Sequence, residues 1–173
     1  MTTFNRGIDQ AAGQGIAYAD IAKQADALGL PLFEMWLPEH ANNAAYAQAF
    51  SETVSAARAA IPGLQSIAFG DISLADLKLW RTQLCGSIGI TPVFPLFGTD
   101  SRALSNAMLR AGLKATLSRI DEDRLPAEFL GMRFDEALLQ RLPSNIDPCG
   151  ENGEFHTQVS MDGLPFTQNH RDT

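Results

Sequence analysis

One short segment near the C-terminus holds most of the side chains that could carry out chemistry. Two glutamates, a histidine and a threonine lie between residues 150 and 157, together with two glycines. Glycine permits a positive φ or a close approach of the backbone to a ligand. The carboxylates and the imidazole could bind a cation, accept a proton or hold an amine. The whole segment reads Asp147-Pro148-Cys149-Gly150-Glu151-Asn152-Gly153-Glu154-Phe155-His156-Thr157.

A second candidate is the pair Gly70-Asp71, which follows a short apolar run that we expect to form a buried strand. In open α/β sheets, ligands bind beyond the carboxyl ends of the parallel strands. Both candidates also have a plainer interpretation. The C-terminal segment could be a polar turn that leads into an edge strand, and Asp71 could be a turn residue before the next helix.

Other reactive groups have weaker support in the sequence. Cys149 lies between a proline and a glycine, and no base can be placed beside it, so a structural thiol is favoured. The sequence has no zinc-ligand spacing, no G-x-S-x-G motif and no Walker-type loop. We therefore predict no metal-binding cluster.

The spacing of apolar residues predicts the elements that must position these segments. We expect strands at residues 31–37, 66–69 and 115–120, and helices at 43–60, from Ser73, from Thr99 or Asp100 to about Gly112, and at 135–142. Asn42 or Asn43 is the expected N-cap of the first of these helices. Strands that alternate with helices indicate a mostly parallel sheet in an α/β fold. The alternation breaks at residues 91–95, so we expect domains at 1–90 and 91–173.

The composition excludes several classes of partner. The 13 basic residues are outnumbered by 20 acidic ones, giving a net charge of −7, which argues against nonspecific binding to nucleic acid or to an anionic membrane. No apolar run approaches the roughly 20 residues needed to span a bilayer, and no signal-peptide pattern is seen. Two cysteines do not form a disulfide framework, so we expect a reducing, cytoplasmic setting.

Taken together, the two candidate segments resemble the ATP-binding family of diphthine–ammonia ligases. The most specific match is the run Gly-Glu-Asn-Gly-Glu-Phe-His-Thr at residues 150–157, and the run Ala-Phe-Gly-Asp-Ile at residues 68–72 supports it. Shorter similarities lie at residues 27–32, 95–98, 120–121 and 130–131. The resemblance therefore covers nearly the whole chain.

The resemblance implies a Rossmann-like parallel sheet of the HUP or pyrophosphatase-loop (PP-loop) type, with a small α+β C-terminal domain. It implies a reaction in which ATP, accompanied by Mg²⁺, activates the carboxylate of a small molecule or a protein as an acyl-adenylate, and ammonia then displaces AMP to leave an amide. It also implies the roles of particular residues. The nucleotide cleft would contain Gly70 and Asp71, the catalytic groups would be Glu151, Glu154 and His156, and the substrate would contact Gly150, Asn152, Gly153 and Thr157.

The sequence departs from the family at its N-terminal end. The family begins with a strand and a Ser-Gly-Gly-Lys-Asp-Ser loop that holds phosphates through backbone amides and a lysine, and this sequence begins after that point. It also has Gln-Gly-Ile-Ala at residues 14–17, where the family has His-Gly-x-Arg. We therefore expect an N-terminally incomplete sheet. Three explanations are open: the chain is a fragment with a misplaced start, a partner chain or a homodimer fills the gap, or the protein has diverged to a binding role. The first of these is favoured.

Two functions follow from these observations. The first is an ATP-dependent amide ligase, in truncated or inactive form, that binds ATP no more tightly than the millimolar range. The alternative is a non-catalytic module that binds a nucleotide or another ligand with the same fold. A pure interaction protein, in which the polar loop is only structural, is a third possibility.

Overall fold

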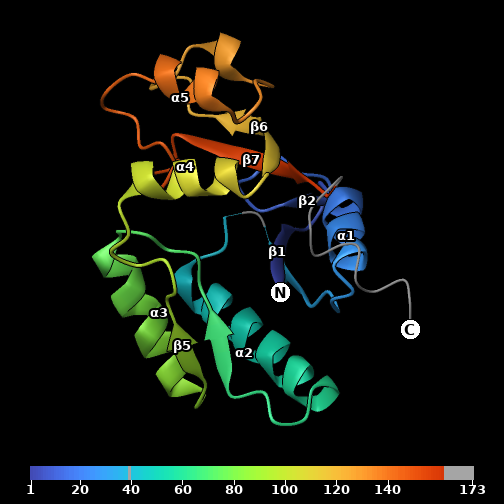
Figure 1. Ribbon diagram of the computed structural model, residues 1–173. Coiled ribbons are helices and arrows are strands. Elements are labelled where there is room, and N and C mark those ends of the chain that lie inside the picture. Colours follow the sequence, from blue (N-terminus) through green and yellow to red (C-terminus); the bar gives the residue numbers. More distant parts are fainter. Residues whose placement is uncertain (39, 162–173) are drawn as a thin grey trace, which may run out of the picture. The chain divides into compact units, whose positions relative to one another are not determined.

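The computed structural model describes residues 1–38 and 40–161, which form two compact units (Figure 1). Unit 1 comprises Met1–Ala12 and Leu32–Thr99, and unit 2 comprises Gly13–Pro31 and the chain from Asp100 onward. Strand β5 (Thr91–Val93) follows the boundary expected after residue 90, yet it pairs with β4 (Ser66–Ala68) inside unit 1. The functional roles expected for the two domains remain predictions.

Unit 1 is an α/β structure with one small mixed sheet and one small parallel sheet. Strand β1 (Thr2–Asn5) pairs in parallel with β3 (Glu34–Leu37) and antiparallel with the short β2 (Gln10–Ala11). Strands β4 and β5 form a separate parallel pair. Helices α2 (Asn43–Ala60) and α3 (Ala75–Ser87) contribute to one apolar core, which contains Met35, Leu37, Phe50, Val54, Phe69, Cys85 and Ile90. The parallel α/β class is confirmed, and the HUP type remains a prediction.

The helix predictions in unit 1 succeed where the local pattern is strong. Helix α2 has the predicted bounds, and the Asn42 Oδ1 accepts a hydrogen bond from the Ala45 amide at 2.9 Å as its N-cap. The second helix was expected to start from Ser73 as its cap, and this position is wrong by one residue. The first intrahelical bond of α3 runs from Lys78 N to Leu74 O, which makes Leu74 the N-cap, without a side-chain cap bond.

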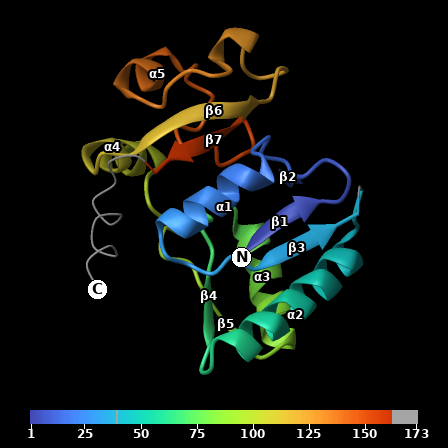
Figure 2. The same cartoon turned by 90° about the vertical axis from the view of Figure 1, so that its right-hand side faces the viewer.

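Unit 2 is built on the antiparallel strands β6 (Lys114–Ile120) and β7 (Phe155–Ser160). Helix α5 (Glu136–Arg141) and the short 3₁₀ helix η1 (Ala127–Phe129) lie on one side of this pair, and α1 (Tyr18–Ala27) lies on the other (Figures 1 and 2). The fourth helix of the unit is α4 (Ser101–Arg110), which Asp100 caps as predicted. No helix in the described part of the chain is long and apolar enough to cross a membrane.

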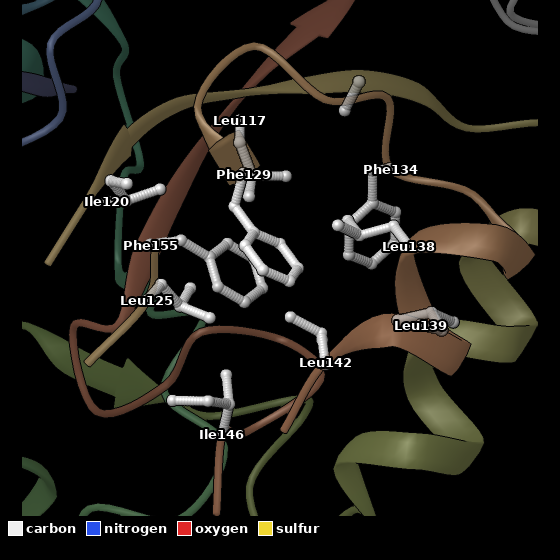
Figure 3. Close-up of a cluster of buried hydrophobic side chains, with 11 residues drawn as sticks. Leu117, Ile120, Leu125, Phe129, Phe134, Leu138, Leu139, Leu142, Ile146 and Phe155 are labelled. Atoms are coloured by element: carbon white, nitrogen blue, oxygen red, sulfur yellow. The ribbon is translucent and has the colours of Figure 1, made fainter. Parts of the chain in front are cut away.

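The core of unit 2 fixes the end of the candidate loop. The buried side chains come from β6, η1, α5, the start of β7 and the segments that connect these elements (Figure 3), and they are Ala115, Leu117, Ile120, Leu125, Phe129, Phe134, Leu138, Leu139, Leu142, Ile146 and Phe155. Phe155 is both the first residue of β7 and the residue that follows the loop, and it is 2% exposed. Its burial therefore anchors the loop at its C-terminal end.

Candidate functional site

Residues 147–154 form a tight loop in unit 2, organised around the side chain of Glu154. This carboxylate is 0% exposed and is surrounded by hydrogen-bond donors. Its Oε1 accepts from the Asp147 amide and from Asn152 Nδ2, each at 3.1 Å, and its Oε2 accepts from the Asn152 amide at 2.9 Å. Burial by itself raises the pKa of Glu154, but these hydrogen bonds and a nearby arginine outweigh it and hold the pKa below its ordinary value. Glu154 is thus an ionised, buried carboxylate that orders the loop.

Arg124 supplies the charge that compensates Glu154, and sequence reasoning did not identify it. Its Nη2 lies 3.1 Å from Glu154 Oε1, and its Nη1 donates to the Asn152 carbonyl at 3.1 Å. A buried carboxylate needs a cation or several donors close by. That requirement was the available signal, because a basic residue, Arg124, follows the short acidic stretch at residues 121–123 that comes directly after β6.

The loop turns around Asp147 and Gly150. Asp147 Oδ1 accepts from the amides of Cys149 at 2.7 Å and Glu151 at 3.3 Å, and the Gly150 amide donates to the Asp147 carbonyl. Gly150 has φ +69°, and a Cβ built there would lie 2.6 Å from the Phe155 carbonyl oxygen. Gly153 also has a positive φ, +80°, but a Cβ there would meet nothing within 4 Å.

The two glycines therefore differ in a way that mutagenesis can measure. We expect Gly150→Ala to lower the free energy of unfolding of unit 2 by about 2 kcal/mol, from the left-handed backbone and the clash together. Gly153→Ala, the matched control, carries only the backbone cost of about 1 kcal/mol. Urea unfolding followed at the amide resonances of β6 and β7 measures both. Equal losses would show that the approach to Phe155 does not shape the loop.

His156 and Thr157 lie on β7, immediately beyond the loop, and both are partly buried. His156 pairs across the strands with Arg119 of β6. Burial, and then the positive charge of Arg119, lower the pKa of His156 below its ordinary value. The neutral form of the imidazole therefore predominates at pH 7, with one ring nitrogen able to accept a proton.

Cys149 has the properties of a structural thiol. Its Sγ donates to the Ser101 carbonyl at 3.2 Å. Burial, together with the carboxylates of Asp147 and Glu151, raises the pKa of the thiol to about 11. Because the thiolate is the nucleophilic form, this environment disfavours covalent chemistry at Cys149.

The second candidate segment lies in unit 1, directly after β4. Asp71 is 9% exposed, and its Oδ2 lies 3.0 Å from Arg81 Nε, close enough for an ion pair although the two groups are not aligned for a hydrogen bond. The Arg81 guanidinium also lies 4.5 Å from the centre of the Phe69 ring. Gly70 is exposed, and a Cβ built there would meet nothing within 4 Å. The pair thus offers open backbone beside a carboxylate whose charge is compensated.

These observations bear on the two implied cofactors. Among the described residues, no group of three or more His, Cys, Asp or Glu side chains could hold a metal ion. Mg²⁺ is commonly held by only one or two carboxylates and the phosphates of a nucleotide, so Asp71 could still contribute one ligand. If phosphates were bound at this strand end, the exposed backbone at Gly70 and the guanidinium of Arg81 would be the groups to contact them.

The candidate residues are thus distributed between two units. Gly70 and Asp71 lie in unit 1, whereas Gly150, Glu151, Asn152, Gly153, Glu154, His156 and Thr157 are brought together in unit 2. Within unit 2, Asn152 and Glu154 are in direct contact, and Glu151 is half-buried beside them. A cleft shared by the two segments, and the catalytic or binding role of each residue, remain predictions.

Comparison with known proteins gives one informative similarity. No protein-family model matches the chain. The chain is similar to the diphthine–ammonia ligase of the fission yeast Schizosaccharomyces pombe, with 28% identity over 102 residues. The matched region covers 57% of this chain and 17% of that ligase. The similarity supports a family resemblance over part of the chain, whereas the sequence predicted a resemblance over nearly all of it.

Proposed function

We propose that this chain is an ATP-dependent ligase-like protein that joins ammonia to a carboxylate. The observation that carries the proposal is the loop of unit 2, in which a buried, ionised Glu154 orders the backbone beside a neutral His156. A loop that is only a solvated turn has no need to bury a carboxylate with several donors, because burial of a charge is costly. The similarity to a diphthine–ammonia ligase also supports a ligase-like activity.

In this proposal, the residues of the loop and of the start of β7 have different roles. His156 accepts a proton from the attacking ammonia, since its lowered pKa leaves a free lone pair at neutral pH. Glu154 is a positioning residue, because its oxygens already accept hydrogen bonds from the loop and from Arg124. The exposed Asn152, with Glu151 and Thr157, contacts the substrate. ATP, when bound, supplies the activation of the carboxylate.

The nucleotide side of the proposal rests on unit 1. Gly70 lets the phosphates approach the backbone, and Arg81 offsets the charge of Asp71, which would otherwise repel them. The sequence has no phosphate loop with a neighbouring lysine, so we expect dissociation constants for ATP in the millimolar range.

A titration of ATP and Mg²⁺ into the ¹⁵N-labelled chain tests the nucleotide site. We expect chemical-shift changes at residues 69–72 that saturate at millimolar ATP, and a loss of affinity of about tenfold in Gly70→Ala, where a methyl group blocks the approach of the phosphates. Gly86→Ala is the matched control, because a Cβ at Gly86 in α3 also meets nothing within 4 Å. A concentration of 10 mM ATP is roughly ten times the expected dissociation constant. If no shifts appeared at that concentration, or if both variants bound ATP equally, the proposed site would be contradicted.

The incomplete sheet belongs to the same proposal. Among the described residues, β4 pairs only with β5, and its other edge takes no strand. An unpaired edge favours pairing with a further strand. A strand from another segment or from a second copy in a homodimer would complete the sheet beside Gly70 and Asp71.

A further inference from the structure

Unit 2 contains a groove of about 1050 Å³ that lies apart from the candidate loop. Helix α1 forms one wall, the strands β6 and β7 form the floor, and the residues after α4 and before α5 close the ends. The groove is lined by Asp20, Lys23, Gln24, Ala27, Leu109, Leu113, Lys114, Ala115, Thr116, Arg133, Phe134, Asp135, Gln158, Val159, Ser160 and Met161. None of these residues belongs to the loop at residues 147–154.

The floor of the groove is a polar face of the strand pair. Side chains alternate between the two faces of a strand, and on β6 the positions of Ala115 and Leu117 face the apolar core. Lys114 and Thr116 therefore lie on the opposite face. Their cross-strand partners are Ser160 and Gln158, which share that face. The Gln24 side chain of α1 donates to the Val159 carbonyl at 2.8 Å and holds the helix against β7.

The charges around the groove leave two cations available. Lys23 pairs with Asp20 at 3.6 Å, and Asp135 Oδ1 accepts from the Leu138 amide as the N-cap of α5. Lys114 and Arg133 are exposed and form no ion pair with any described residue. Arg133 pairs with Thr116 across the strands, so it lies on the same face as Lys114 and diagonally from it. Two neighbouring cations on a chain of net charge −7 form a local site for an anion.

We propose that this groove binds a small amphipathic organic anion. Its carboxylate or phosphate group is held by Lys114 and Arg133. Its apolar body lies against Leu109, Leu113 and Met161, and Thr116 and Gln158 offer hydrogen bonds at the floor. The volume lies at the upper end of that of ordinary small-molecule sites. This site is independent of the proposed ligase function, since the two share no residue.

Three probes of equal chain length test the proposal: octanoate, octyl phosphate and the uncharged octanamide. We expect octanoate or octyl phosphate to shift the amide resonances of residues 114–116, 133 and 158–160 in a saturable way. Octanamide should bind about tenfold more weakly, because it lacks the charge. The tighter of the two anions identifies the head group. Equal affinity for octanamide, or shifts confined to other residues, would overturn the proposal.

Charge-removing variants provide the second test. Lys114→Met and Arg133→Met keep most of the aliphatic stem and should each weaken binding of the preferred anion by about tenfold. Arg102→Met in α4 is the matched control, because Arg102 is exposed, carries the same charge and does not line the groove. The replaced side chains are all exposed, and thermal unfolding should be unchanged. If Arg102→Met lost as much affinity as the groove variants, the effect would come from the net charge of the chain, and the proposed site would be refuted.

Discussion

Replacing Glu154 with glutamine is expected to lower the free energy of unfolding of unit 2 by about 3 kcal/mol. Glutamine keeps the volume of the side chain but replaces one acceptor oxygen with an amide that donates. That amide would face the N–H groups of Asp147, Asn152 or Arg124, whose hydrogen bonds the carboxylate now accepts. The guanidinium of Arg124, only partly exposed, would also lose its counter-ion.

The measurement has to report on unit 2 alone. Both tryptophans, Trp36 and Trp80, belong to unit 1, so urea unfolding should be followed at the amide resonances of β6 and β7. Glu122→Gln is the matched control, since Glu122 is exposed and its replacement removes the same charge close to Arg124 in the sequence. Its effect should stay within about 0.5 kcal/mol. If the two variants lost the same stability, the buried carboxylate would not be what orders the loop.

The difference in stability between the wild-type chain and Glu154→Gln should depend on pH. The folded-state pKa of Glu154 lies below the ordinary value of 4.5, so ionisation stabilises the folded state above that pH. The stabilisation is lost as the pH falls through the lowered pKa of the folded state. The difference between the wild-type chain and Glu154→Gln should therefore be constant from pH 7 down to about pH 5 and narrow below it. A difference that grows on acidification would mean that the pKa is raised instead.

Local sequence patterns predicted the parts of the fold that local interactions determine. Helix α2 has a continuous apolar face, with Phe50, Val54 and Ala57 buried, and a capping asparagine, so its bounds follow from the sequence. Helix α1 was not predicted, because only Ile21 is buried along it and no side chain caps its start at Ala17. Its position depends on a contact 135 residues away, between Gln24 and Val159.

The set of segments that form unit 2, and the hydrogen bonds inside the loop, also depend on residues that are distant in the sequence. Residues 13–31 join unit 2, where Arg119 donates to the Gly13 carbonyl and Ser118 to the Gln14 carbonyl. The types of residue in the loop were visible in the sequence, but their arrangement was not. A glutamate between a glycine and a phenylalanine reads as a solvated turn until Arg124, thirty residues earlier, is placed beside it.

The loss of His156 is expected to have the largest effect on activity. We expect the wild-type chain, given ATP, Mg²⁺, ammonium and a diphthine-bearing protein, to release AMP, and His156→Ala to release it at least about 100-fold more slowly. Diphthine is the substrate that the name of the similar yeast ligase states. A non-catalytic binding module would instead show the ATP-induced shifts at residues 69–72 without any release of AMP by the wild-type chain.

A second readout separates a proton-accepting role of His156 from a structural one. Because only the neutral imidazole accepts a proton, the rate should fall as the pH drops through a pKa that burial and Arg119 hold below 6.5. In His156→Ala this acidic limb should disappear, and added imidazole should restore part of the rate in proportion to its neutral form. A variant that is slow, keeps the acidic limb and does not respond to imidazole would make His156 a packing residue of β7. The proton would then have to pass to another of the residues predicted to be catalytic. Glu151, half-buried at the turn of the loop, is the better candidate, because the carboxylate of Glu154 is already engaged with the loop and with Arg124.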